Sequence, residues 1–352
     1  MHDRLLADFA AGKKAALARA ISIVENHRPG FEQLLAAWNR QLGRARRIGI
    51  TGPPGAGKST LTTALARAYR AQRLTVGIIA VDPTSPFTGG ALLGDRIRME
   101  DVALDPGVYI RSLATRGSLG GLSSATRESC DVLDAFGVDR ILIETVGVGQ
   151  SELDVARAAD TSLVVLVPES GDAIQTLKAG VMEIADVFTV NKADRPGADR
   201  LRNEIEIMLG MRSGATMRDV PAHHGVDLSR NNLVRQVRDA ARAEDADVWT
   251  PPVLRTVAAK GEGIDELVEA LDRHFRYLER SGTLRERRRA RLRERVVEVV
   301  EDKARRRLWG DAATNAWLED KLPALEAGDA TPFGIADALL ARSADLLTRN
   351  NS

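Results

Sequence analysis

Short apolar runs alternate with helical stretches between residues 46 and 280. Unbroken runs of Val, Ile and Leu separated by helices are typical of strands that are buried on both faces of a mainly parallel sheet. The pattern therefore predicts an α/β core. The seven runs are RRIGITG, LTVGIIAVD, GVYIRSL, RILIETVG, TSLVVLVP, DVFTVNKAD and PVLRTVAA.

The two ends of the chain have helical periodicity instead. In residues 1–45, Leu17, Ile21 and Val24 recur near helical spacing, and the RPG at residues 28–30 separates them from a second helix. After residue 280 the sequence is again helical, and a last helix is expected to start at Thr331, before a proline suited to a first turn. We therefore expect an N-terminal helical extension (1–45), a central domain (46–280) and a C-terminal helical arm (281–352).

Composition excludes several classes of protein. Fifty basic residues balance 49 acidic ones in a chain of 352, so bulk charge favours neither nucleic acid nor an anionic membrane as a partner. A single cysteine, Cys130, excludes an internal disulfide and is expected to be a small buried residue, and five histidines leave little material for a zinc site. The N-terminus lacks an apolar signal region and no apolar run reaches about 18 residues. We expect a cytoplasmic protein with no signal peptide and no membrane span.

The strongest motif is GPPGAGKS, residues 52–59, which fills the pattern G-x-x-x-x-G-K-[ST] directly between a predicted strand and a predicted helix. Its glycines let backbone N–H groups form an anion nest at a helix N-terminus, Lys58 reaches the outer phosphates, and the Ser59 hydroxyl binds Mg²⁺. The motif predicts nucleoside triphosphate binding. The expected contacts here are Gly55, Ala56, Gly57, Lys58, Ser59 and Thr60.

The sequence NKAD, residues 191–194, closes another predicted strand and predicts the base. The carboxylate of Asp194 offers two acceptors to the N1–H and N2–H₂ donors of guanine, whereas adenine has an acceptor at N1. Asn191 is expected to brace the loop, and the stem of Lys192 to lie over the base. The Ser-Ala-Lys usual in the last base-side loop of GTPases is replaced by Val257, Ala258 and Ala259, which leaves backbone N–H contacts to the guanine oxygen.

Acidic residues follow the apolar runs. Glu144 ends a strand where ligands of parallel sheets bind, so its charge is expected to pair with Mg²⁺ through a water, while the N–H of Gly147 meets the γ-phosphate. Asp82 and Asp95 are candidates for the outer metal shell. Either aspartate is alternatively a helix cap.

Several long segments together resemble one family. They include LARAISIVEN, GPPGAGKST, VDPTSPFTGGALLGDRIRM, TRGSLGGLS, ETVGVGQSELDV, VPESGDAIQTLKAGVMEIADVFTVNKAD and PPVLRTVAAKGEGIDEL. They resemble the MeaB and methylmalonic aciduria type A protein family, older relatives of which were labelled ArgK or LAO/AO transport ATPases. The resemblance covers roughly residues 10–280. It implies a P-loop fold of the signal-recognition and MinD-like branch.

The same resemblance implies a function and partners. It implies a homodimeric GTPase, using GTP or GDP with Mg²⁺, that acts as a chaperone for an adenosylcobalamin-dependent acyl-CoA mutase, with the adenosyltransferase of that mutase as a further candidate partner. Such a chaperone gates cofactor loading and protects or reactivates the mutase. The sequence does not identify the client, whether of methylmalonyl, isobutyryl, ethylmalonyl or hydroxyisobutyryl type.

Residue by residue, the resemblance assigns Lys58 and Ser59 to phosphate and Mg²⁺. It assigns the metal-site acids to Asp82, Asp95 and Glu144, and base reading to Asn191, Lys192 and Asp194. It also implies that SGDAIQTLKAG is a third switch segment that connects the nucleotide to the partner through Asp172, Gln175 and Lys178. Without the resemblance, the same segment would be interpreted as the start of a helix with Asp172 as its N-cap.

Hydrolysis requires a positioned water and charge compensation in a loose transition state. Lys58 and Mg²⁺ supply the charge, and Glu144 and Asp95 complete the catalytic set. No residue convincingly orients the water, because Gln150 lies three positions beyond Gly147. Slow intrinsic turnover, stimulated by the partner, is therefore expected.

Other conspicuous features have plainer explanations, and two rival functions remain open. His223 and His224 are expected to face solvent, and the seven arginines between Arg285 and Arg295 to lie on a solvated or dimer-facing helix. A nickel-type metallochaperone GTPase is one rival, although a His- or Cys-rich segment is lacking. A P-loop kinase, as the ArgK label suggested, is the other, but it has no need of a guanine pocket.

Overall fold

The computed structural model describes residues 2–83, 99–115, 124–145, 151–168, 182–212, 228–242 and 248–343. The chain divides into two compact units, Met1–Arg285 and Glu286–Ser352. Each unit is described by itself.

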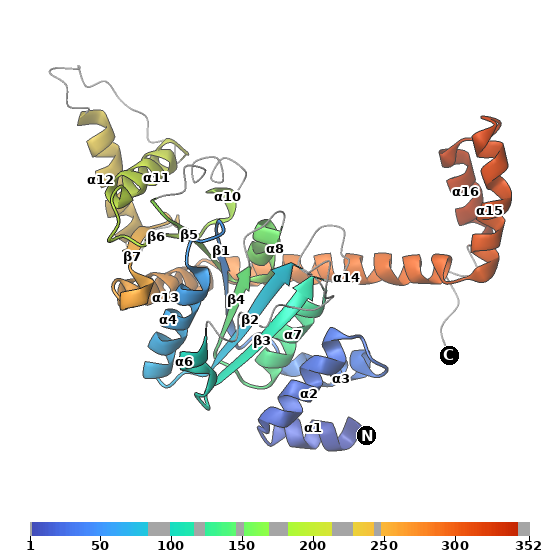
Figure 1. Cartoon of the computed structure of the whole chain (residues 1–352), viewed down its shortest axis with the longest axis horizontal. Coiled ribbons are helices and arrows are strands. Elements are labelled where there is room, and N and C mark those ends of the chain that lie inside the picture. The colour runs from blue at the N-terminus through green and yellow to red at the C-terminus, as the bar shows by residue number, and fades with distance from the viewer. Residues whose placement is uncertain are drawn as a thin grey trace. The chain divides into compact units, whose positions relative to one another are not determined.

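A seven-stranded sheet forms the centre of the first unit (Figure 1). Its strand order is β3-β2-β4-β1-β5-β6-β7, and every neighbouring pair is parallel. The predicted α/β fold with a mainly parallel sheet is confirmed, since each apolar run contains one strand. The strands are β1 (Arg46–Thr51), β2 (Val76–Pro83), β3 (Val108–Thr115), β4 (Arg140–Thr145), β5 (Thr161–Leu166), β6 (Val187–Asn191) and β7 (Val253–Thr256).

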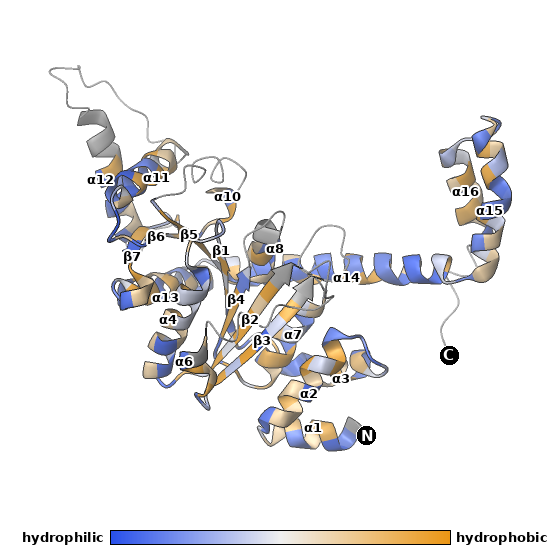
Figure 2. Cartoon of the chain, in the orientation of Figure 1, coloured by the Kyte–Doolittle hydropathy of each residue, from blue (hydrophilic) through white to orange (hydrophobic). Residues whose placement is uncertain are grey.

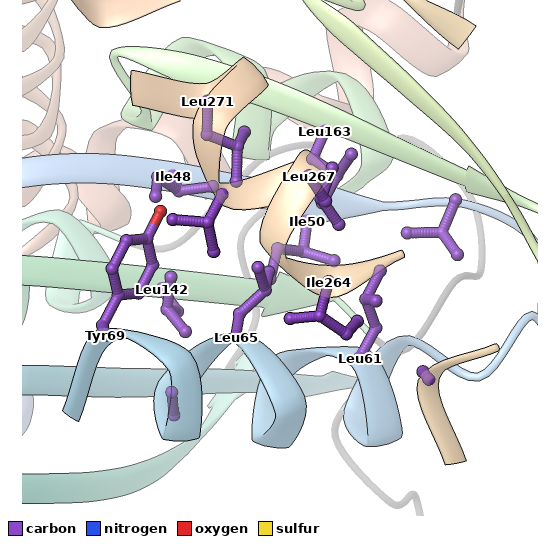
Figure 3. Packing of buried hydrophobic residues seen from close by; sticks show 14 of the residues in the cluster. Ile48, Ile50, Leu61, Leu65, Tyr69, Leu142, Leu163, Ile264, Leu267 and Leu271 are labelled. Carbon is purple, nitrogen blue, oxygen red and sulfur yellow. The ribbon is translucent and has the colours of Figure 1, made fainter. Parts of the chain in front are cut away.

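Helices cover both faces of this sheet. Successive side chains of a strand point to opposite faces, so an unbroken apolar run places apolar side chains on both faces, and both must be covered. Ile78 of β2 packs in the cluster that α4 (Lys58–Ala71) and α13 (Ile264–Arg280) complete, and Figure 3 shows the leucines of these helices against β1, β4 and β5. Ile79, the next residue, belongs to the cluster on the other face. The helices that complete the other face are α7 (Ser124–Ala135), α8 (Ser151–Ala158) and α11 (Ala198–Arg212).

Three further described helices join the sheet connections. They are α6 (Glu100–Ala103), α10 (Met182–Ile184) and α12 (Leu228–Arg242), and the one-turn 3₁₀ helix η3 (Ala258–Lys260) follows β7. The helix α12 packs on α11. The strand β7 lies at one end of the sheet and contacts α11 and α13.

The N-terminal helices pack on the sheet-covering helix α7 and belong to the first compact unit. They are α1 (His2–Ala10), α2 (Lys14–Glu25), α3 (Phe31–Trp38) and the 3₁₀ helix η1 (Asn39–Gln41). Phe9 stacks on Trp38 with ring centroids 4.2 Å apart and contacts Phe136 edge-on at 5.0 Å. Cys130 is fully buried in α7, which confirms the prediction for this residue.

The second unit is helical. It contains most of α14 (Thr283–Trp309), then α15 (Ala312–Glu326) and α16 (Pro332–Arg342). The Thr331 hydroxyl accepts a hydrogen bond from the N–H of Gly334 at 3.2 Å, which confirms the predicted helix start. Figure 2 shows that α14 is largely hydrophilic. Within the described ranges, no helix has both the length and the apolar character needed to cross a membrane.

Candidate functional site

The loop between β1 and α4 adopts backbone conformations that favour glycine. Gly52, Gly55 and Gly57 have positive φ angles of 140°, 75° and 83°. A Cβ at position 52 would lie 2.1 Å from the carbonyl oxygen of Val165, and one at Gly57 would lie 2.6 Å from Nδ2 of Asn191. Larger residues are therefore excluded at two of the three motif glycines by contact as well as by conformation. The strand, glycine-rich loop and helix follow each other as the motif requires.

Lys58, the first residue of α4, is buried and its ammonium group bends back over this loop. Its Nζ donates to the carbonyl oxygens of Gly52 at 2.7 Å and Pro53 at 3.0 Å. The loop thus holds a positive charge at the point where the N-terminus of α4 also favours an anion. Thr60 lies in the same first helical turn.

Ser59 of α4 and Glu144 of β4 are hydrogen-bonded to each other. The Ser59 hydroxyl lies at the start of α4, Glu144 is the penultimate residue of β4, and the hydroxyl donates to Oε1 of Glu144 at 2.5 Å. Glu144 is only 4% exposed. A hydroxyl and a carboxylate are oxygen ligands that suit Mg²⁺, with waters filling its other positions. The donor set at this point therefore fits a magnesium ion.

Several predicted residues lie outside the described part of the chain. These are Asp95, Gly147, Gln150, Asp172, Gln175, Lys178, His223 and His224. Asp82 lies in β2, paired in register with Ala114 of β3, but its side chain is outside the described residues. The roles expected for all of them stay predictions.

Asn191 connects the phosphate loop to the loop after β7. Its Nδ2 donates to the carbonyl oxygen of Ala56 at 2.8 Å, and its Oδ1 accepts from the N–H of Ala258 at 3.1 Å and from the Thr256 hydroxyl at 3.2 Å. The side chain is 2% exposed, so these bonds form in the protein interior. A single amide thereby fixes the separation of the two loops that are expected to hold the phosphates and the base.

Asp194 lies beyond the end of β6 and carries a negative charge at neutral pH. Lys192 has a positive φ of 55°, which bends the chain between Asn191 and Asp194. The Oδ2 atom of Asp194 accepts from Nζ of Lys260 at 3.0 Å, and this hydrogen bond is the main reason that the pKa of Asp194 is lowered. A cavity of about 410 Å³ opens between Asp194 and the loop after β7. The stacking of Lys192 on a base stays a prediction.

Two backbone N–H groups of the loop after β7, which were expected to face the base, form hydrogen bonds within the protein. The N–H of Val257 donates to the carbonyl oxygen of Glu262 at 3.0 Å, and that of Ala258 donates to Asn191. Both donors are therefore used within the protein. Of the three residues named from the sequence, only Ala259 has an N–H outside the hydrogen bonds that the described residues form. The guanine contacts expected of all three stay predictions, and the N–H of Ala259 is the one that needs no exchange of partner within the described residues.

Lys260 was not predicted from the sequence as a site residue. It lies 66 positions after Asp194, and the pairing of β6 with β7 places η3, which ends at Lys260, beside the loop that carries Asp194. The one available signal was a basic residue directly after the three residues expected to face the base.

The chain matches a family model over residues 17–313. The family is described as methylmalonyl Co-A mutase-associated GTPase MeaB. The chain belongs to the MeaB family. This confirms the resemblance seen in the sequence.

Individual relatives agree with this assignment. A Pyrococcus horikoshii protein named as a GTPase is 43% identical, over 96% of this chain and 97% of its own length. The GTPase ArgK of Escherichia coli is 33% identical, over 91% and 90%, and the mitochondrial methylmalonic aciduria type A homolog of Mus musculus is 31% identical, over 96% and 78%. A crystal structure titled LAO/AO transport system kinase aligns with a TM-score of 0.63 and 26% identity, over 99% of this chain and 97% of that one. The protein is thus a P-loop GTPase.

Proposed function

We propose that the protein is a Mg²⁺-dependent, slowly hydrolysing GTPase that gates cofactor loading of an adenosylcobalamin-dependent acyl-CoA mutase and protects or reactivates that mutase. One observation supports the GTPase part of this proposal. Lys58, Ser59 and Glu144 lie at the same carboxyl ends of the strands as the Asn191–Asp194 loop. The carboxyl ends of parallel strands are where ligands of open α/β sheets bind. The mutase half is supported by the family description.

Each residue has a task in nucleotide binding. Backbone N–H groups of residues 55–60 bind the phosphates, while the Lys58 ammonium exchanges its two carbonyl partners for phosphate oxygens. Asp194 accepts from N1–H and N2–H₂ of guanine. The Ala259 N–H meets the guanine oxygen. Asn191 keeps the two halves of the site at a fixed distance.

Magnesium would be held by the Ser59 hydroxyl and, through water, by Glu144. When bound, the ion supplies positive charge to the phosphate oxygens. Binding of the ion would replace the direct hydrogen bond from Ser59 to Glu144. We include Asp82 and Asp95 in the same outer shell. These assignments extend the donor chemistry at residues 59 and 144 to two side chains that the structure does not describe.

Hydrolysis by the isolated protein is expected to be slow. Lys58 supplies charge to the transition state, but no described side chain at the site is identified as orienting the attacking water. We assign that step to ordering by the partner, through Asp172, Gln175 and Lys178. A client that orders the site would raise the rate without adding binding energy for GTP itself.

We further propose that residues 281–352 form a dimerisation arm. The support is an apolar stretch on α14 in which Leu292, Val296 and Val300 are 62%, 63% and 59% exposed. Contiguous apolar patches on a protein surface are typical of sites that bind another protein. Sedimentation of the full chain tests this: a dimer is expected, and Val296→Glu with Val300→Glu should convert it to a monomer.

The mutase role is tested by pull-down of purified candidate mutases in GDP and in a non-hydrolysable GTP analogue. One mutase is expected to bind with an affinity that differs between the two nucleotides. Asp194→Asn should remove the nucleotide dependence, whereas Asp199→Asn, on the neighbouring helix α11, should retain it. If no adenosylcobalamin-dependent mutase binds in either nucleotide, the mutase half is wrong, while GTP hydrolysis measured separately decides the GTPase half. Radiolabelled γ-phosphate recovered on an acceptor in place of free phosphate would indicate the kinase instead.

A further inference from the structure

A second cavity, of about 230 Å³, lies at the outer edge of the sheet and contains none of the predicted nucleotide contacts. It is enclosed by β7 and by one face each of α11, α12 and α13. Four arginines line it, and we call it the arginine cavity. They are Arg202, Arg238, Arg242 and Arg273.

Two of these arginines are hydrogen-bonded to one buried glutamate. Glu206 is 1% exposed, and its Oε1 accepts from Nε of Arg202 at 3.1 Å. Arg238 donates to both carboxylate oxygens of Glu206, from Nε at 2.8 Å and from an Nη at 2.7 Å. This bidentate pair with a further arginine satisfies the carboxylate, so Glu206 has little capacity left for another cation.

The other two arginines have no such partner. Among the described residues, neither Arg242 nor Arg273 forms a hydrogen bond or an ion pair, and the Nε of Arg273 is fully shielded from solvent without an acceptor. Glu269 lies one helical turn before Arg273 on the same face of α13, but the two side chains are not within ion-pair distance. Buried donors in native proteins are almost always satisfied, so the guanidinium of Arg273, a residue that lines the cavity and is unpaired in the described part of the chain, has donors left for an acceptor that enters from outside.

The floor of the arginine cavity is apolar. Val237 and Ala241 of α12, Val253 of β7 and Ala270 of α13 are all at least nine-tenths buried, and Leu254 lies beside them. Guanidinium groups bind planar carboxylates and phosphates through paired hydrogen bonds, and the apolar floor favours a hydrocarbon portion on the same molecule. A few polar groups above an apolar surface are the usual composition of a small-molecule site.

We propose that the arginine cavity binds a small organic anion, a carboxylate or phosphate attached to an apolar group, through Arg273 and Arg242. The site is distinct from the nucleotide site and does not depend on the proposed function. The two cavities are nevertheless adjacent, because the one beside Asp194 shares Arg202, Leu254 and Glu266 with the arginine cavity. An anion that moves Arg202 would therefore also change the wall of the cavity beside Asp194. The affinities for the anion and for the nucleotide would then affect each other by the same factor.

Titration calorimetry of the full chain with benzoate, phenyl phosphate and benzyl alcohol tests the proposal. The two anions distinguish carboxylate from phosphate, and the alcohol reports on the apolar floor alone. At least one anion is expected to bind while benzyl alcohol does not. Arg273→Gln should weaken binding by about tenfold or more, and Arg242→Gln should weaken it as well.

Two control variants complete the experiment. Arg276→Gln removes an exposed arginine from the same helix but outside the cavity, and it should bind as the wild type does. Lys58→Ala alters the phosphate loop and should also retain binding. Loss of binding in Lys58→Ala alone would place the anion in the phosphate loop and overturn the proposal. Failure of both anions to bind at millimolar concentration would overturn it too. So would an affinity equal to that of the wild type in both Arg273→Gln and Arg242→Gln. Thermal unfolding of each variant verifies the fold, and Arg242→Gln decides the matter if Arg273→Gln does not fold.

Discussion

The hydroxyl of Ser59 donates a 2.5 Å hydrogen bond to Glu144, so the first turn of α4 is bound to the end of β4. Glu144 is nearly inaccessible to solvent. A buried carboxylate costs several kcal/mol of desolvation unless it is paired. The hydroxyl compensates part of that cost, and a divalent cation would compensate more. This supports our proposal that the pair holds the metal.

Replacing Glu144 with Gln tests the metal position. The amide keeps the shape and an acceptor for the Ser59 hydroxyl but loses the charge, so the fold should persist while Mg²⁺ binding weakens. Because Glu144 is expected to act through a water, GTP hydrolysis should fall by about 10- to 100-fold, the range for residues behind the first metal shell. The measurement is the hydrolysis rate as a function of Mg²⁺ concentration.

The matched control is Glu128→Gln, since Glu128 of α7 is about as buried but pairs with His27, two residues after the end of α2. It should leave the Mg²⁺ dependence unchanged. An unaltered Mg²⁺ dependence in Glu144→Gln would show that this carboxylate has no part in metal binding.

The pair between Lys260 and Asp194 predicts a pH dependence. The hydrogen bond from Lys260 lowers the pKa of Asp194, and guanine requires the ionised carboxylate. Wild-type affinity for GTP should therefore persist as the pH falls until it reaches that lowered pKa. In Lys260→Met the pKa of Asp194 rises toward its ordinary value, so affinity should be lost at a higher pH. At neutral pH, where Asp194 is ionised in both proteins, the difference should be small.

The measurement is GTP affinity from neutral pH downward for both proteins. Titration of the GTP phosphates is common to the two and cancels in their ratio. Lys321→Met is the control, because Lys321 lowers the pKa of Asp320 in the same way but lies on α15. Superimposable profiles for wild type and Lys260→Met would show that Lys260 does not act on the base-reading carboxylate.

Asn191 should contribute to stability as well as to binding. Asn191→Ala leaves the Ala56 carbonyl and the Ala258 N–H without their buried partner. The loss of a buried hydrogen-bonding partner costs about 1–3 kcal/mol for each group left unsatisfied. We expect a decrease of that order in the free energy of unfolding in denaturant, together with weaker GTP binding. Asn315→Ala removes hydrogen bonds to backbone carbonyls at an exposed position and should cost much less.

Much of the fold followed from local pattern. Each strand is an apolar run whose length and continuity suit a two-sided sheet, so all seven were predicted, and the phosphate loop was recognised because the strand and helix around it are required by its chemistry. Glu144 was recognisable because a charged residue at the end of a buried strand demands a partner. These features depend on neighbours in sequence.

The contacts that the sequence did not reveal depend on distant segments. Lys260 reaches Asp194 because the pairing of β6 with β7 places η3 beside the loop after β6. The use of the Ala258 N–H by Asn191 likewise depends on the register of β6 against β7. The arginine cavity combines four chain segments, and no local pattern identifies it.

The central claim is that Asp194 reads guanine, and nucleotide calorimetry with the variant Asp194→Asn tests it most directly. Xanthine carries a carbonyl group where guanine carries the N2 amine, so an Asn amide can accept from N1–H and donate to that carbonyl. With Mg²⁺ present, we predict that the wild type binds GTP more tightly than ATP or XTP, and that Asp194→Asn prefers XTP. Asp199→Asn should behave as the wild type. Equal affinity of the wild type for ATP and GTP, or an unchanged preference for GTP in Asp194→Asn, would contradict the account.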